Sequence, residues 1–176
     1  GQAMVGLVAN DIRAGARPVF FQGSEYAGTV EPYAVALAFS LLGSSANVQR
    51  SVVAFSFATF AALLAAAAGV WFGRRAALGA GLYVALGPAY LLYKGFTSDG
   101  HYGPVLLVGG ACCLLQALVV RQAEDGSGFG RLLFPLGLLH GVGIWVSPLC
   151  VSYLAPSAVV LLTRPVRPVL RPRELA

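Results

Sequence analysis

The apolar sequence S-V-V-A-F-S-F-A-T-F-A-A-L-L-A-A-A-A-G-V-W-F, residues 51–72, decides the fold of this chain. It contains no charged residue and is rich in alanine and phenylalanine. A helix needs about 20 apolar residues to cross a bilayer, and this stretch is long enough. Arg74 and Arg75 follow it directly, as basic residues do at the ends of membrane spans. The stretch therefore predicts a transmembrane helix.

Further apolar stretches repeat this pattern towards the C-terminus. The chain is 57% hydrophobic and only 11% charged, whereas a soluble domain carries about 25% charged residues. Pro88 predicts a kink in the second span. We expect an all-α, polytopic transmembrane bundle in which residues 48–163 form five spans, followed by a basic tail or linker over 164–176. The spans are expected at 51–72, 76–93, 104–120, 132–146 and 149–163.

Residues 1–47 are too short and too polar to add a span, and we expect two interfacial helices there. Residues 2–14 place Met4, Leu7, Val8 and Ile12 on one helical stripe. A second helix is predicted from Thr29, as its N-cap, to Leu42, with Gly43 ending it. A proline disfavours helical backbone in the residue before it, so Pro32 is expected to hold Glu31 in an extended conformation.

The basic residues predict how the spans are oriented. Loops after the first, third and fifth spans carry eight arginines, whereas the other side carries four basic residues. The positive-inside rule places the eight in the cytoplasm. The loop over 17–33 and the loop over 96–102 then both lie on the periplasmic or lumenal face. Both loops are polar, aromatic and acidic, so their meeting indicates a site; the alternative is a connector whose aromatic residues anchor at the headgroups.

The N-terminal sequence G-Q-A-M-V-G-L-V-A-N-D-I-R-A-G-A-R-P-V-F-F-Q-G-S-E-Y-A-G-T-V-E-P-Y, residues 1–33, resembles the first outer loop of GT-C membrane glycosyltransferases. The resemblance is to bacterial relatives of dolichyl-phosphate-mannose–protein mannosyltransferases and aminoarabinose transferases. G-R-R after the first span, the loop over 100–102 and I-W-V-S-P-L at 144–149 extend it. Such enzymes are two to four times longer, so we expect an N-terminal fragment, inactive alone, because the family's acidic pair would precede Gly1.

This resemblance implies inverting transfer of a sugar from a polyprenyl-phosphate donor to an acceptor hydroxyl at the outer membrane surface. It does not specify whether the acceptor is a protein, a lipid or a glycan. It also does not specify whether a divalent metal is required. The membrane is the bacterial inner membrane, or that of the endoplasmic reticulum in a eukaryote. The implied catalytic residues are Glu31 and Glu25. The implied substrate-binding residues are Tyr26, Tyr33, Arg17, Lys94 and His101.

Other readings of the sequence remain open beside this one. Glycine-rich helices and His140, an ionisable residue within a span, are typical of a small transporter or channel module; a non-catalytic scaffold subunit is a third reading. For His140 itself we favour a neutral side chain bonded to a neighbouring helix, and for Asp11 a solvated helix face. The three cysteines have no metal-ligand spacing and are expected to pack. The basic residues lie at span ends, which argues against nucleic-acid binding.

Overall fold

The computed structural model describes residues 1–22, 26–126 and 130–163 of the chain. The protein is all-α, as expected, and its described part contains no strand beyond an isolated bridge between Phe20 and Gly28. The expected tail over 164–176 lies outside the described residues. The elements are α1 (Gln2–Arg13), α2 (Val30–Leu42), α3 (Ala46–Phe72), α4 (Arg74–Ala85), α5 (Ala89–Phe96), α6 (Tyr102–Glu124), α7 (Gly130–Val146), the 3₁₀ turn η1 (Pro148–Cys150) and α8 (Val151–Thr163).

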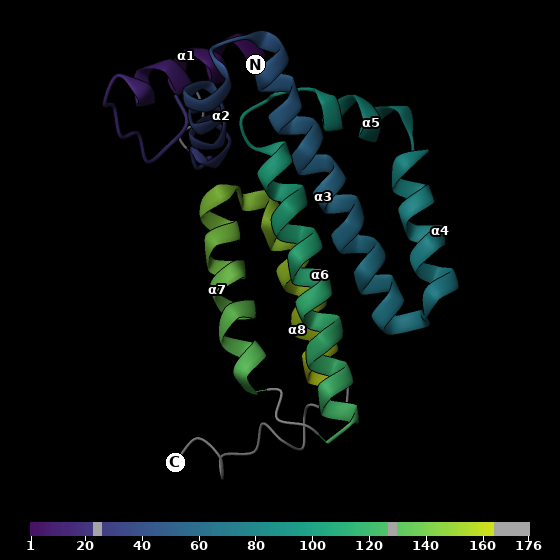
Figure 1. Cartoon of the computed structure of the whole chain (residues 1–176). Helices are drawn as coiled ribbons and strands as arrows, with labels where there is room; N and C mark the ends of the chain where they lie inside the picture. Colours follow the sequence, from purple (N-terminus) through teal and green to yellow (C-terminus); the bar gives the residue numbers. More distant parts are fainter. Residues whose placement is uncertain (23–25, 127–129, 164–176) are drawn as a thin grey trace, which may run out of the picture.

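Helices α3 and α6 form the centre of the bundle and pack along each other (Figure 1). Both are long and apolar enough to cross a membrane. Helix α3 buries only part of its apolar surface, so Phe55 and Phe72 are 75% and 77% exposed in the protein alone. A soluble protein rarely leaves such a surface to water, but a membrane protein turns it to lipid. The length and composition of its helices therefore indicate that the chain is an integral membrane protein.

The expected second span is broken rather than kinked. Helices α4 and α5 meet at an angle of 74°, and α5 lies across the end of the bundle (Figure 1). Pro88 is responsible, because proline has no N–H to continue the helical ladder and its ring clashes with the preceding turn. Consequently Lys94 does not end a straight span but lies on the transverse helix α5. Counted as one unit, the pair would be a third span.

Helices α7 and α8 run beside α6 and cover one side of it. They are apolar but shorter than a regular span: the 17 residues of α7 rise only about 26 Å. Two helices of the described part are thus long enough to cross a membrane, or three with the α4–α5 pair. The prediction of five spans stays a prediction for α7 and α8.

Helices α1, α2 and α5 gather at one end of the bundle, opposite the α3–α4 turn (Figure 1). Helix α1 packs on α2 through a core of Val5, Val8, Ala9, Val35, Ala36 and Phe39. Two residues of the expected apolar stripe, Met4 and Leu7, are instead 40% and 60% exposed. The buried face of α1 is centred on Val5, Val8 and Ala9 rather than on the predicted stripe. The reason is that α1 packs against α2, and not against a flat membrane surface.

Candidate functional site

Residues 18–21 contact residues 27–29, and these contacts fix the start of α2. The Thr29 hydroxyl, fully buried, donates to the carbonyl of Pro18 at 2.7 Å and lies 3.1 Å from that of Val19. The backbone N–H of Phe21 donates to the carbonyl of Ala27 at 2.7 Å. Thr29 occupies the N-cap position of α2, as predicted, but its side chain makes no cap bond.

Gly28 attaches this loop to the end of α7. Its backbone N–H donates to the carbonyl of Val146 at 3.1 Å. A Cβ at Gly28 would lie 3.1 Å from ring carbons of Trp145, which is closer than an ordinary side-chain contact. A residue without a side chain is therefore needed for the loop to approach α7, and this approach positions the first turn of α2 over the bundle.

Glu31 lies in this first turn and is 4% exposed. The prediction of an extended backbone for Glu31 is wrong, because Glu31 is helical. Pro32 is tolerated in the first turn of α2 because the N–H groups there have no hydrogen-bond partner within the helix. The Ser98 hydroxyl donates to Glu31 Oε1 at 2.5 Å, and Oε2 has no hydrogen-bond partner. Burial raises the pKa of Glu31; the Ser98 hydroxyl and the Gly100 backbone oppose the rise, and the Asp99 charge adds to it.

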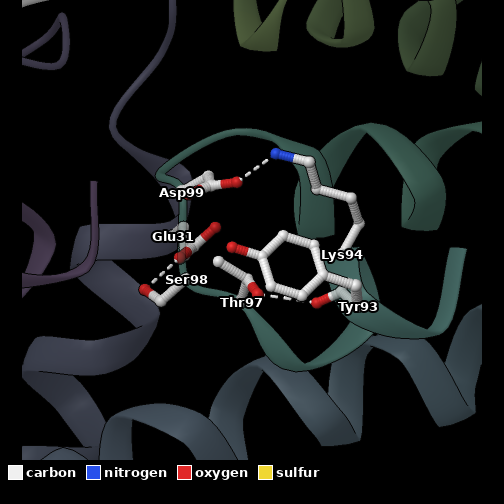
Figure 2. A network of polar contacts seen from close by, with 6 residues as sticks. All are labelled: Glu31, Tyr93, Lys94, Thr97, Ser98 and Asp99. Carbon is white, nitrogen blue, oxygen red and sulfur yellow. Dashed lines mark hydrogen bonds and ion pairs between the residues drawn. The ribbon is translucent and has the colours of Figure 1, made fainter. Parts of the chain in front are cut away.

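Two loops meet at Glu31, as the orientation of the spans predicted. Gly100, with φ of +91°, brings the loop over 97–101 against the ring of Phe21, to which a Cβ at Gly100 would be 3.1 Å. Ser98 of this loop is fully buried, and its hydroxyl contacts the carboxyl group of Glu31 (Figure 2). The site is thus formed by two segments that lie far apart in the sequence.

Gln49 extends the hydrogen-bond network and was missed in the sequence. Its Nε2 donates to Ser98 Oγ and to the carbonyl of Gln2, both at 2.8 Å. Gln49 lies in the first turns of α3, which begins earlier than expected because the Ser45 hydroxyl caps it at the N–H of Val48. A signal did exist: Gln49 falls on the same helical face as the buried Val53, Phe57 and Phe60.

Lys94 and Asp99 form an ion pair beside Glu31, with Nζ and Oδ2 2.5 Å apart (Figure 2). Their side chains are 18% and 20% exposed. The Lys94 ammonium also lies over the ring of Tyr102, 4.3 Å from its centroid, and within about 6 Å of two further tyrosine rings. Lys94 therefore belongs to the site, but its charge is shared with Asp99, which was not among the predicted site residues.

His101 lies next to Tyr102, close to the Lys94–Asp99 ion pair. Its ring stacks on Tyr102 with centroids 4.6 Å apart, and its Nδ1 is buried with no partner. Burial lowers the pKa of His101, an effect that the nearby Lys94 charge reinforces and Asp99 opposes. The lowered pKa favours the neutral imidazole, which can make a hydrogen bond.

An apolar groove extends from Lys94 along the bundle. It has a volume of about 330 Å³ and is bordered by α5, α6 and the η1–α8 segment. Lys94 is the one charged residue among those that line it, and Tyr90, Tyr102 and Tyr153 supply its other large polar side chains. The groove thus has one cationic end and otherwise apolar walls.

The remaining predicted residues are not brought into the site. Tyr26 and Tyr33 are 62% and 39% exposed, and Arg17 is exposed on the loop. Asp11 is exposed, as expected, and borders a separate surface hollow. Glu25 lies outside the described residues. No cluster of three or more His, Cys, Asp or Glu side chains suited to a metal occurs among the described residues.

His140 makes the contact expected of it in the bundle. Its Nε2 lies 3.1 Å from Ser157 Oγ on α8, and its Nδ1 2.8 Å from the carbonyl of Leu136. The Ser157 hydroxyl also lies 3.3 Å from the Oε1 of Gln116 on α6. This cluster links three helices, as polar groups do inside membrane bundles.

Comparison of the chain with protein-family models, with curated proteins and with solved structures gives no match in any of the three.

Proposed function

We propose that this chain carries the reaction site of a GT-C-type glycosyltransferase, which moves a sugar from a polyprenyl phosphate to an acceptor hydroxyl with inversion. The observation that supports it is a single constellation. A buried carboxyl group with one unpartnered oxygen, Glu31, and a cation, Lys94, contact neighbouring residues of one loop, Ser98 and Asp99, at the end of an apolar bundle. A lipid-linked anionic donor needs these three features together: a proton acceptor, a counter-charge and an apolar surface.

The groove that begins at Lys94 suits the lipid donor. An isoprenoid chain can move from the lipid to these apolar walls without meeting water. The donor phosphate would then lie at the Lys94 end, where charge-assisted hydrogen bonds are stronger than neutral ones. Since Asp99 already bonds Lys94, the arriving phosphate has to compete with this carboxylate. Binding of the donor thus changes the ion pair at the site.

Glu31 suits the proton transfer in this reaction. The acceptor oxygen attacks C1 of the sugar while the bond between C1 and the phosphate oxygen breaks, and the bonding pair leaves with the phosphate. The proton of the acceptor hydroxyl passes to the Glu31 carboxylate. Because burial raises the pKa of Glu31, this group is a stronger base than an exposed glutamate, which favours proton transfer near neutral pH. Lys94 stabilises the charge on the departing phosphate.

The site is placed on the periplasmic or lumenal face in this proposal. The arginine distribution supports this orientation, and the bacterial inner membrane is the corresponding location. The lipid phosphate of a donor lies at the membrane–water interface, which is also where α1, α2 and α5 gather at one end of the bundle. The protein need not bring a hydrophilic donor across the membrane for such a reaction.

Binding of polyprenyl phosphate to the full-length protein in lipid nanodiscs tests the donor site without knowledge of the sugar. We expect saturable binding that Lys94→Gln weakens about tenfold, equivalent to about 1.4 kcal/mol. Arg17→Gln removes an exposed charge from the same end of the molecule and serves as the control, with affinity unchanged. Absence of binding, or equal affinity of the Lys94 and Arg17 variants, would refute the donor site.

A transporter is the second candidate, and the broken α4–α5 pair together with the His140 cluster favours it. Transporters place broken helices around a binding site near the middle of the membrane. Here the two features are apart: the break lies on α4 and α5, whereas the cluster joins α6, α7 and α8. Uptake that is lost in His140→Ala but retained in Glu31→Gln would favour transport over sugar transfer.

A further inference from the structure

A small cavity lies next to Glu31, on the inner side of the site. It has a volume of about 40 Å³, enough for a water molecule. Side chains of α2, α3 and the start of α6 enclose it, and Glu31 is one of them. Glu31 Oε2 has no hydrogen-bond partner and would lie 3.7 Å from a Cβ at Gly103, another residue of the lining. Its lining residues are Val30, Glu31, Ala34, Val52, Val53, Ser56, Gly103, Pro104 and Leu107.

The lining decides which ligand this carboxyl group can take. Ca²⁺ and Mg²⁺ surround themselves with about six to eight oxygen atoms. Among the residues that line the cavity, Ser56 supplies the only other side-chain oxygen, and its hydroxyl already donates to the carbonyl of Val52 at 2.9 Å. A metal cation would remain under-coordinated there. A proton needs no further ligand than the carboxyl oxygen that it binds.

The charges around Glu31 also favour the proton. Helices α2 and α3 and the first turn of α6 present no basic side chain to it: Gln49 and Ser56 are neutral, and Gly103 and Pro104 carry no polar side chain. From the loop over 97–101, Asp99 repels a second negative charge. Lys94 is bound to Asp99, and His101 is kept neutral by burial. An ionised Glu31 would therefore be a buried negative charge that bonds the Ser98 hydroxyl but has no basic side chain to pair with, which is costly.

We propose that Glu31 and this cavity form a proton-binding site, in which Oε2 carries the proton at rest and a water molecule in the cavity receives it. In the exchange step the O–H bond on Oε2 breaks and an O–H bond forms on the water, while another O–H bond of that water breaks and its proton passes to bulk water. The electron pair stays on the carboxylate, and the water molecule in the cavity is neutral again. The Ser98 hydroxyl continues to donate to Oε1 in both states.

This site adds regulation to the proposed reaction. With Glu31 protonated at rest, sugar transfer requires that the proton first leave through the cavity, so the rate rises with pH through the pKa of Glu31. That consequence rests on the proposed function, whereas the proton site does not, because the cavity and the unpartnered oxygen are present without any substrate. A failed transfer assay and a missing proton are therefore distinguishable results.

Infrared difference spectroscopy of the full-length protein in nanodiscs detects the proton directly. We expect a carboxylic C=O band at neutral pH that is absent from Glu31→Gln and disappears only well above pH 4.5, the ordinary pKa of glutamate. Glu31→Gln keeps an acceptor for Ser98 and a hydrogen-bearing group towards the cavity, so its folding is preserved. A spectrum without this band at neutral pH would overturn the proposal.

Gly103→Ala tests the water in the cavity. The added Cβ would lie 3.7 Å from Glu31 Oε2 and 3.8 Å from Ser56 Cβ, both ordinary contacts, so it fills the cavity without forcing the helices apart. We expect the C=O band to move to higher frequency because the carboxyl loses its hydrogen bond to water. Gly137→Ala, on α7 where a Cβ meets no atom within 4 Å, is the matched control. An unchanged C=O frequency in Gly103→Ala would refute the presence of a water molecule hydrogen-bonded to Glu31.

Discussion

Ser98→Ala is the substitution that most directly perturbs the site without altering a charge. Ser98 is fully buried and joins Glu31 to Gln49, through bonds of 2.5 Å and 2.8 Å. Removing its hydroxyl takes the Ser98 donor from Oε1 of a buried carboxyl group whose Oε2 has no partner. Loss of a partner for a buried polar group costs about 1–3 kcal/mol. Gln49 keeps its bond to the Gln2 carbonyl, so we expect the cost to arise at Glu31.

The free energy of unfolding in detergent, measured for a double-mutant cycle of Ser98→Ala and Glu31→Leu, isolates this contact, because leucine has a similar size and no acceptor. We expect a coupling free energy of about 0.5–1.5 kcal/mol, the net contribution of a hydrogen bond. Since the Ser98 hydroxyl lowers the pKa of Glu31, the carboxylic band of Ser98→Ala should also persist to higher pH. Ser51→Ala removes an exposed hydroxyl bonded within α3 and is the control. Equal stabilities for the two serine variants, with zero coupling, would refute the reasoning.

Three further predictions concern the loop, the charge and the orientation. Thr29→Val should destabilise the protein by about 1–3 kcal/mol, because the buried carbonyl of Pro18 loses its donor; thermal unfolding checks this, with Ser40→Ala, whose residue is exposed, as the control. Burial raises the pKa of Glu31, so its stabilising contribution is complete below pH 4.5 and is lost as the pH rises through the folded-state pKa. Glu31→Gln should therefore gain stability relative to the parent over this window, by about 1.4 kcal/mol for each unit of pKa rise, and a pH-independent difference would contradict it. In a cysteine-free background, Asp11→Cys should react with an impermeant reagent in intact cells and Asp125→Cys should not; the reverse pattern would invert the orientation.

The helices could be predicted from the sequence because local signals mark them. Gly43 and Gly73 end helices with positive φ angles of +87° and +86°, and long apolar stretches lie between such breaks. Pro88 was recognised as a perturbation, yet the size of the bend was not. Whether a proline kinks a helix or turns it by 74° depends on what the following segment packs against, and this information is not local.

Part of the site could be predicted and part could not. Glu31 and Lys94 stand out because charged residues are rare in this chain, but Ser98 carries no signal, since a serine in a loop is unremarkable until its burial is known. The pairing of Lys94 with Asp99 depends on a loop that folds back after α5 ends. Tyr26 was predicted for its chemistry alone, and its 62% exposure shows that chemistry does not determine which side of a loop faces the site.

The rate of sugar transfer by the full-length protein with Glu31→Gln tests the central claim most directly. Polyprenyl-phosphate mannose and polyprenyl-phosphate aminoarabinose serve as donors, and release of polyprenyl phosphate is followed beside the melting temperature. We predict that the parent transfers sugar and that Glu31→Gln lowers the rate by about 10²-fold or more, the contribution of a positioned acid–base group, while its melting temperature is no lower than that of the parent. Asp125→Asn, an exposed acid on the opposite side of the bundle, should retain full activity. A Glu31→Gln protein that folds and transfers sugar at a near-normal rate would contradict the account.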